Sequence, residues 1–174
     1  MSQTIDARLP ALEGELQEFR DRDAIRDDIH RYCEAIDRCD PEMLKSCYWP
    51  DGYDDHSCFA GNAYQFAEYV IPCLEAVDSS VHAITKTGFK FDGDRCACTS
   101  QRHVVHRLAH EAGYTEFLHD GRYLDVWEKR EGEWRLLDRF VRFTGSVMSI
   151  EEARRPSLLA KRSVALALRS HIGR

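Results

Sequence analysis

The sequence has no uncharged apolar run long enough to cross a bilayer, no CxxC pair and no excess of basic residues. A membrane-spanning helix needs about 20 consecutive apolar residues, so a membrane protein is not expected. The net charge of −6, with basic residues scattered among acidic ones, disfavours a nucleic-acid partner. The N-terminal segment has early acids and no apolar stretch, which argues against a secretory signal. We therefore expect a cytoplasmic protein.

Seven cysteines are an odd number without the paired spacing of a zinc or disulfide framework, and reduced core thiols are the better interpretation. The histidines at 103, 106 and 110 are a second group that could form a metal site. On a helix they would share one face and suggest a metal site. On a strand, His106 points one way with Val104 and Leu108, while His103 points the other. The strand interpretation predicts one inward histidine and no metal site.

The length and composition are those of one globular domain. Apolar residues make up 43% and charged residues 31% of the 174 residues, a balance typical of folded soluble chains. No internal repeat or low-complexity tract divides the sequence. We expect a single domain over residues 1–174, with its core at about 20–146 and a helical tail at 147–174.

The first half of the chain has the periodicity of helices. Apolar residues recur at helical spacing over 9–19 and 23–38, and we expect one apolar stripe to continue through both segments. Asp37 lies on the flank of that stripe. Asp40 followed by proline predicts a short helix to about residue 47. Another helix is expected over 66–77, with a kink at its internal proline.

The second half of the chain has the period of strands. A turn at 49–53 leads into a short strand near Tyr53. Long strands are predicted over 82–91, 95–110, 115–130 and 133–145, with hairpin turns at Asp92-Gly93 and Glu131-Gly132. Helices followed by a meander of long strands indicate an α+β fold, in which a curved mixed or antiparallel sheet wraps around the N-terminal helices. Such a cone-shaped barrel leaves a cavity between sheet and helix.

Three stretches carry a resemblance to a known family: YCEAIDRCDPEMLKSCYWPDGY, VHAITKTGFKF and DVWEKREGEWRLLDRFVRF. With the order of elements, they resemble the SnoaL-like branch of the nuclear transport factor 2 superfamily over roughly residues 20–146. Cofactor-independent dehydratases and dehydrochlorinases of this branch place an aspartate late in the first helix against a histidine that opens a strand. The matching positions are Asp37 and His82. The resemblance therefore implies a lyase without a cofactor.

The resemblance implies further site residues. A bile-acid dehydratase of the branch has a tyrosine and an arginine at the positions of Tyr32 and Arg142, but an acidic residue where this chain has His106. Scytalone dehydratase has a histidine on that strand, so the substrate stays open. Arg142 would suit an anionic group, although it would equally pair with a carboxylate on a neighbouring strand. The remaining candidates are aromatic residues expected to bind substrate: Tyr53, Tyr48, Trp49 and Phe140.

An imidazole held by a carboxylate is a suitable base for elimination. We therefore expect a dehydratase or related eliminase that acts on a hydrophobic cyclic or aromatic alcohol. Alternatives are a lyase that releases formaldehyde from lignin-derived diaryl compounds, an isomerase or cyclase with the same base, and a non-catalytic module like the small subunit of ring-hydroxylating dioxygenases. His56, His103, His110 and His119 are expected on the surface or in loops. The branch suggests a homodimer or homotrimer.

Overall fold

The computed structural model describes residues 8–152 of the chain. Two helices come first, two short strands and a third helix follow, and four long strands complete the described part of the chain. The helices are α2 (Leu9–Asp37), α3 (Pro41–Ser46) and α4 (Ala63–Leu74). The strands are β1 (Tyr48–Asp55), β2 (Ala60–Asn62), β3 (Ser79–Asp92), β4 (Arg95–His110), β5 (Gly113–Arg130) and β6 (Glu133–Glu152).

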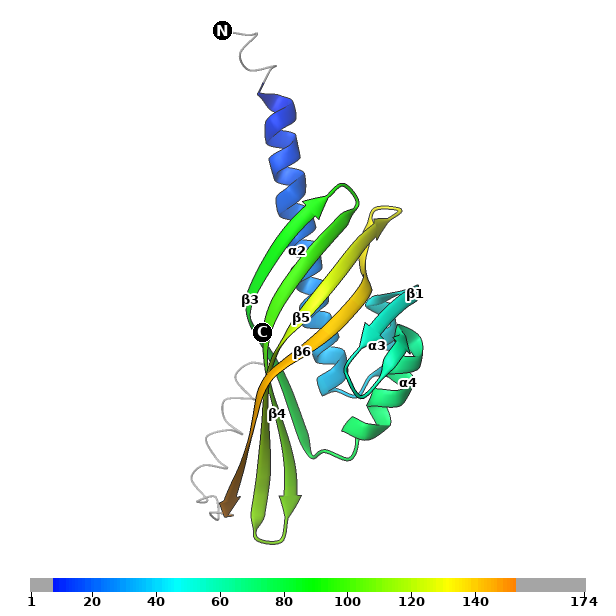
Figure 1. Cartoon of the computed structure of the whole chain (residues 1–174). Helices are drawn as coiled ribbons and strands as arrows, with labels where there is room; N and C mark the ends of the chain where they lie inside the picture. The colour runs from blue at the N-terminus through cyan, green and yellow to red at the C-terminus, as the bar shows by residue number, and fades with distance from the viewer. Residues whose placement is uncertain (1–7, 153–174) are drawn as a thin grey trace, which may run out of the picture.

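The six strands form one curved sheet in the order β2-β1-β6-β5-β4-β3. All neighbours are antiparallel except β1 and β6, which run parallel. Figure 1 shows the long strands curving past α2, with α3 and α4 beside the β1 end of the sheet. The predicted α+β fold, with a curved mixed sheet around the N-terminal helices, is confirmed. The sheet is open, with β2 and β3 at its edges.

Three local predictions need correction. The segments 9–19 and 23–38 form one continuous helix, α2. The turn expected at 49–53 lies inside β1, where the pairing with β6 slips between Tyr48 and Tyr53. Strand β6 continues to Glu152, so the helical tail expected over 147–174 begins too early; the rest of that segment lies outside the described residues. Within 8–152, no helix is long and apolar enough to cross a membrane.

The end of α2 is fixed by backbone hydrogen bonds that place Asp37. Cys39 adopts a left-handed conformation with φ of 53°, which is the usual geometry of the residue after a helix cap. Its N–H donates to the Ile36 carbonyl at 3.1 Å, and the Asp40 N–H donates to the Ala35 carbonyl at 2.9 Å. These two bonds form a Schellman motif. The chain therefore leaves α2 directly after Asp37.

A buried ion pair lies in the core between the sheet and α2. Arg139 donates from Nε and Nη2 to the two carboxylate oxygens of Asp125, each at 2.8 Å, and neither side chain is exposed. The guanidinium carbon lies 4.0 Å from the ring centroid of Tyr32 and 3.8 Å from that of Tyr123. Cation–π contacts and a bidentate pair together offset the desolvation of this charge.

Replacing Asp125 with asparagine should lower the free energy of unfolding by about 3–5 kcal/mol, because it leaves the Arg139 charge buried without its counter-ion. Urea unfolding at neutral pH measures the change. The matched control is Arg95→Met, which breaks an exposed pair with Glu128 and should cost no more than about 1 kcal/mol. The double variant Asp125→Leu/Arg139→Met should recover part of the loss. Equal effects of Asp125→Asn and Arg95→Met would contradict this account.

Candidate active site

A cavity of about 240 Å³ lies between the sheet, α2 and α4. Its apolar wall comes mainly from the two helices, and its polar wall comes mainly from β3, β4 and β5. Its volume is below the roughly 300–1,000 Å³ of pockets that hold drug-sized ligands. The lining residues are Tyr32, Ile36, His56, Phe66, Val70, Leu74, His82, Arg102, Val104, His106, His119 and Phe143.

The structure brings Asp37 and His82 together at one side of this cavity. His82 Nδ1 lies 2.7 Å from Asp37 Oδ1, and the His82 backbone N–H donates to Asp37 Oδ2 at 2.9 Å. The Ser80 hydroxyl donates to Asp37 Oδ1 at 2.9 Å. A carboxylate on Nδ1 fixes the tautomer in which Nδ1 carries the proton, so Nε2 is the nitrogen that can accept one.

Burial and hydrogen bonding set the charges of this pair. Burial lowers the pKa of His82 below 6.5, although Asp37 acts in the opposite direction. For Asp37, burial acts to raise the pKa, but the hydrogen bonds from the His82 ring and backbone and from Ser80 outweigh it, and the pKa falls below 3.8. At neutral pH the pair is therefore a neutral imidazole held by a carboxylate, which is the form that accepts a proton.

Strand β4 contributes Arg102, Val104 and His106 to the same face of the sheet. Burial lowers the pKa of His106 to about 4, with further lowering by His82 and His119. The ring centroid of His106 lies 6.0 Å from that of His82 and 5.5 Å from that of His119. His106 Nε2 is buried with no hydrogen-bond partner among the described residues. These histidines form an uncharged polar wall at neutral pH.

His56, another cavity residue, belongs to a second histidine–aspartate pair. His56 Nδ1 is hydrogen-bonded to Asp54 Oδ1, and the buried Asp54 also accepts a hydrogen bond from the Tyr48 hydroxyl. The His56 ring stacks on Phe66 with centroids 4.3 Å apart. The hydrogen bond to Asp54 and the stacking on Phe66 therefore fix the orientation of this ring.

Tyr32 lies on α2 at the cavity wall and is 1% exposed. Its hydroxyl has no hydrogen-bond partner among residues 8–152. Burial raises the pKa of Tyr32 well above 10, so the hydroxyl keeps its proton at neutral pH. The Tyr32 hydroxyl is therefore able to donate a hydrogen bond but is not suited to act as a base.

Several residues predicted for the site lie elsewhere. Arg142 and Phe140 are exposed on the outer face of β6, because the inward positions of that strand are Arg139 and Val141. Tyr53 is 45% exposed on β1 and is not a cavity residue.

The other two aromatic predictions also lie off the cavity. Trp49 donates from Nε1 to the Glu128 carbonyl at 2.8 Å, beside the guanidinium groups of Arg130 and Arg135. Tyr48 is buried below the cavity as the partner of Asp54.

His56 and His119 were expected on the surface or in loops, and this prediction is wrong, because both line the cavity. Arg102 was not predicted for the site, although strand alternation gave a signal for it. Arg102 shares its parity with His106 on β4, and Asp54 shares its parity with His56 at the end of β1. His119 lies directly opposite Val104 across the β4–β5 pairing. Period-two alternation places such residues on one face.

The histidines at 103, 106 and 110 lie on strand β4, as the strand interpretation predicted. His106 faces the cavity, whereas His103 pairs with Asp120 at 2.6 Å and is 43% exposed. His110 ends the strand in an exposed position. Among the described residues, no group of three or more histidine, cysteine, aspartate or glutamate side chains could hold a metal ion.

Comparison with known families agrees with the fold. The SnoaL-like domain family matches residues 17–139, most of the chain. The chain belongs to the SnoaL-like domain family. No curated protein matches its sequence.

Solved structures of other SnoaL-like and related proteins superpose on most of this chain. A putative scytalone dehydratase from Novosphingobium aromaticivorans matches with a TM-score of 0.67 and 19% identity, over 84% of this chain and 97% of that one. A hexachlorocyclohexane dehydrochlorinase from Novosphingobium barchaimii matches with a TM-score of 0.71 and 16% identity, over 82% of this chain and 99% of that one. A protein of unknown function from Mycobacterium tuberculosis matches with a TM-score of 0.64 and 25% identity, over 87% of this chain and 96% of that one. These similarities establish the shared fold.

Two of the cavity histidines, His82 and His106, should titrate at lower pH values than an ordinary histidine with a pKa of 6.5. His106 should stay neutral down to about pH 4, and the pKa of His82 should lie below 6.5. In Asp37→Asn the pKa of His82 should fall further, because the carboxylate that raises it is removed while burial remains. NMR titration of the histidine rings measures both values, with His110→Gln as a control that leaves them unchanged. A rise of the His82 pKa in Asp37→Asn would contradict the assignment.

Proposed function

We propose that this protein is a cofactor-independent lyase of the dehydratase type, with His82 as its base. The substrate is a hydrophobic cyclic or aromatic molecule that carries a hydroxyl group. The observation that supports this most is the His82–Asp37 pair, with Nδ1 and Oδ1 2.7 Å apart at the wall of a mainly apolar cavity. A neutral, buried imidazole with one nitrogen held by a carboxylate is suited to remove a proton from carbon.

In the proposed reaction, His82 Nε2 takes a proton from the carbon next to the one that carries the hydroxyl. The C–H electron pair forms the new double bond, and the carbon–oxygen bond breaks. The departing hydroxide takes a proton from His56 and leaves as water. Proton return from His82 to His56 through solvent restores both rings. Substrate thus becomes alkene and water with no redox change.

His56 is the proposed proton donor because it faces the cavity with its own carboxylate. Asp54 lies on Nδ1 of this ring, so Nε2 is the ring nitrogen left to donate a proton to a bound molecule. His106 is unsuited to this role at neutral pH, since burial lowers its pKa to about 4. Its neutral ring is instead suited to orient the hydroxyl group by hydrogen bonding.

The apolar wall supports the proposed substrate class. Ile36, Phe66, Val70 and Leu74 face the cavity from the helices, opposite the polar side chains of the sheet. Such a wall binds ring carbons by excluding water. With about 240 Å³ available, one ring or two fused rings fit the space better than a multi-ring molecule.

His82→Ala and Asp37→Asn should each lower kcat/KM by about 10²–10⁴-fold, the usual contribution of a positioned base. The assay measures loss of water from a panel of one- and two-ring alcohols, hydroxylated steroids and diaryl alcohols without added metal. His103→Ala is the matched control, because His103 has the same kind of carboxylate partner but lies on the outer face. Wild-type kcat/KM should rise with pH through the lowered pKa of His82, because the base must be unprotonated. Full turnover in His82→Ala would exclude the proposed base.

The role of His56 is separable from that of His82. His56→Gln should lower turnover of an alcohol but spare the matching bromide, because bromide leaves without a proton. Measurement of kcat on the alcohol and the bromide gives the ratio. Equal losses on both substrates would contradict proton donation by His56.

A further inference from the structure

Arg102 is the one cavity residue whose full charge is not used by the proposed elimination. Its side chain lines the cavity, and the residue is 4% exposed. Within residues 8–152, it forms no ion pair with a carboxylate. Its Nε and Nη2 atoms are buried and have no hydrogen-bond partner there. A buried guanidinium of this kind is costly unless an anion compensates it.

The surroundings of Arg102 hold the guanidinium in place without neutralising it. Its central carbon lies 4.6 Å from the Phe143 ring centroid and 5.4 Å from that of Tyr123. Gly121 lies directly opposite Arg102 on β5, and a Cβ there would lie 3.2 Å from Nε and 3.3 Å from Nη2. The absence of a side chain at Gly121 therefore makes room for the guanidinium over β5.

The ion pair of Arg139 shows what the unpartnered Nε and Nη2 atoms of Arg102 are suited to bind. Arg139 uses its Nε and Nη2 atoms on the two oxygens of Asp125. The same two atoms of Arg102 are the ones without partners. This edge of a guanidinium matches the spacing of two carboxylate oxygens. Asp37 is already engaged by His82 and Ser80, so a carboxylate group of a bound molecule is the partner that the free atoms of Arg102 are suited to take.

We propose that Arg102 binds a carboxylate group of the substrate, so that the substrate is a small cyclic or aromatic acid. This inference rests on the proposed function for the identity of the bound molecule as substrate. Ile84 lies opposite Arg102 on β3, two residues from His82. Arg102 would thus anchor the acid group at one end of the polar wall, while His82 acts on a neighbouring carbon.

Binding of defined probes tests this without any need for turnover. Benzoate and 1-naphthoate are compared with their uncharged amides by isothermal titration calorimetry. Wild-type protein should bind each acid more than tenfold more tightly than its amide. Arg102→Met should lose this preference, and Arg102→Lys should keep part of it, because lysine has the charge but lacks the planar fork.

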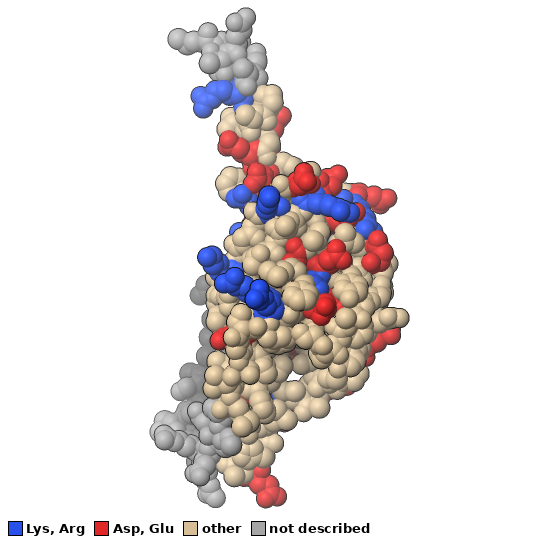
Figure 2. Space-filling model, viewed as in Figure 1, with Lys and Arg blue, Asp and Glu red and all other residues tan. Residues whose placement is uncertain are grey.

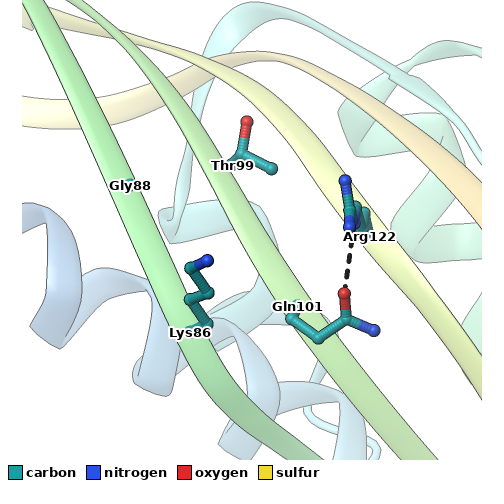
Figure 3. A pocket seen from close by; sticks show the side chains of 5 residues that line it. All are labelled: Lys86, Gly88, Thr99, Gln101 and Arg122. Carbon is teal, nitrogen blue, oxygen red and sulfur yellow. Dashed lines mark hydrogen bonds between the residues drawn. The ribbon is translucent and has the colours of Figure 1, made fainter.

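Arg122→Met is the matched control. Arg122 lies on the outer face of the sheet, where it donates to Gln101 at 3.1 Å beside Lys86 and Thr99, away from the helices (Figure 3). This variant should keep the full preference for the acids. Loss of the preference in Arg122→Met, or its survival in Arg102→Met, would overturn the proposal. So would equal affinity of acid and amide, or no binding of either acid.

Two further measurements separate this proposal from a structural role and from the proposed function. If Arg102 served only the fold, Arg102→Met would lower the melting temperature; removal of an uncompensated buried charge should leave it unchanged or raise it. The preference for the acids should persist in His82→Ala. If the preference persists but no substrate is turned over, the proposed lyase activity would be contradicted, and acid binding by Arg102 would still be supported. If turnover depends on His82 but acids bind no better than amides, only the proposed role of Arg102 would be contradicted.

A separate observation concerns the N-terminal half of α2. Leu9, Leu12, Leu16 and Phe19 are 47%, 53%, 49% and 65% exposed, and Figure 1 shows this part of the helix projecting beyond the sheet. At about 100° per residue, this stripe lies roughly 150° around the helix from the buried stripe that begins at Ile25. The expectation of one continuous stripe was therefore wrong: the first stripe faces away from the domain's own core.

The exposed stripe has the spacing and flanking charges of a parallel coiled coil. Its apolar residues occupy the a and d positions of two heptads. In a parallel pair, each g position faces the e position five residues later on the other helix. The resulting pairs are Arg8 with Glu13, Glu15 with Arg20, and Arg22 with Asp27, and each joins opposite charges. An antiparallel pair would instead bring Glu13 near its own copy.

We infer that a second copy of this chain covers the stripe through a parallel pairing of the two α2 helices. Residues 8–20 are exposed on all sides, and a helix of about 12–15 residues without packing is marginal in water. Strand β6 ends at the far end of the molecule from the start of α2 (Figure 1). The copy is therefore a better occupant than the segment that follows β6.

Sedimentation over a range of concentrations measures the association of the full-length chain. Leu12→Glu/Leu16→Glu should weaken self-association more than tenfold, whereas Gln17→Glu, on the outer side of the helix, should not. Arg20→Glu should weaken it, and Glu15→Arg/Arg20→Glu should restore it, because the exchange recreates the pair. An unchanged mass in Leu12→Glu/Leu16→Glu, or no restoration by the exchange, would overturn the pairing.

Discussion

The candidate site depends on the hydrogen bonds between Asp37 and His82. These bonds join the last residue of α2 to the beginning of β3. Asp37 accepts from the His82 ring, the His82 backbone and Ser80. These bonds hold the helix end against an edge strand whose outer side has no strand neighbour. The same bonds fix the imidazole tautomer. One carboxylate thus joins the end of α2 to β3 and fixes the tautomer of the histidine that we propose as the base.

The elements of the fold were predictable because their local signals agree with the tertiary structure. Both hairpin turns form with glycines at positive φ, at Gly93 and Gly132, as the Asp-Gly and Glu-Gly pairs indicated. The juxtaposition of Asp37 and His82 was predicted from family resemblance. Composition alone gives no reason for residues 45 apart to meet.

The errors at the site come from strand parity. In the segment 138–143 of β6, arginine and large apolar residues occur on both faces, with Arg139 and Val141 inside and Phe140 and Arg142 outside. Hydrophobicity therefore does not choose between the two registers, and a shift of one residue moves every side chain to the other face. On β4, the inward parity of His106 was predicted, but its consequence for Arg102 was not drawn.

The two inward arginines show how charge is divided between stability and binding. Arg139 is enclosed by two tyrosine rings and paired with Asp125, so its charge is balanced within the fold. Arg102 has aromatic neighbours but no acid among the described residues. Most charged side chains on the face in Figure 2 gather over its upper half, while the lower half is largely uncharged. The cost of burying Arg102 is hard to explain by packing alone, because an aliphatic residue would fill the same space without desolvating a charge. An anionic group that enters the cavity would offset that cost. Of the two inward arginines, Arg139 would then have its partner inside the chain and Arg102 would have its partner in a bound molecule.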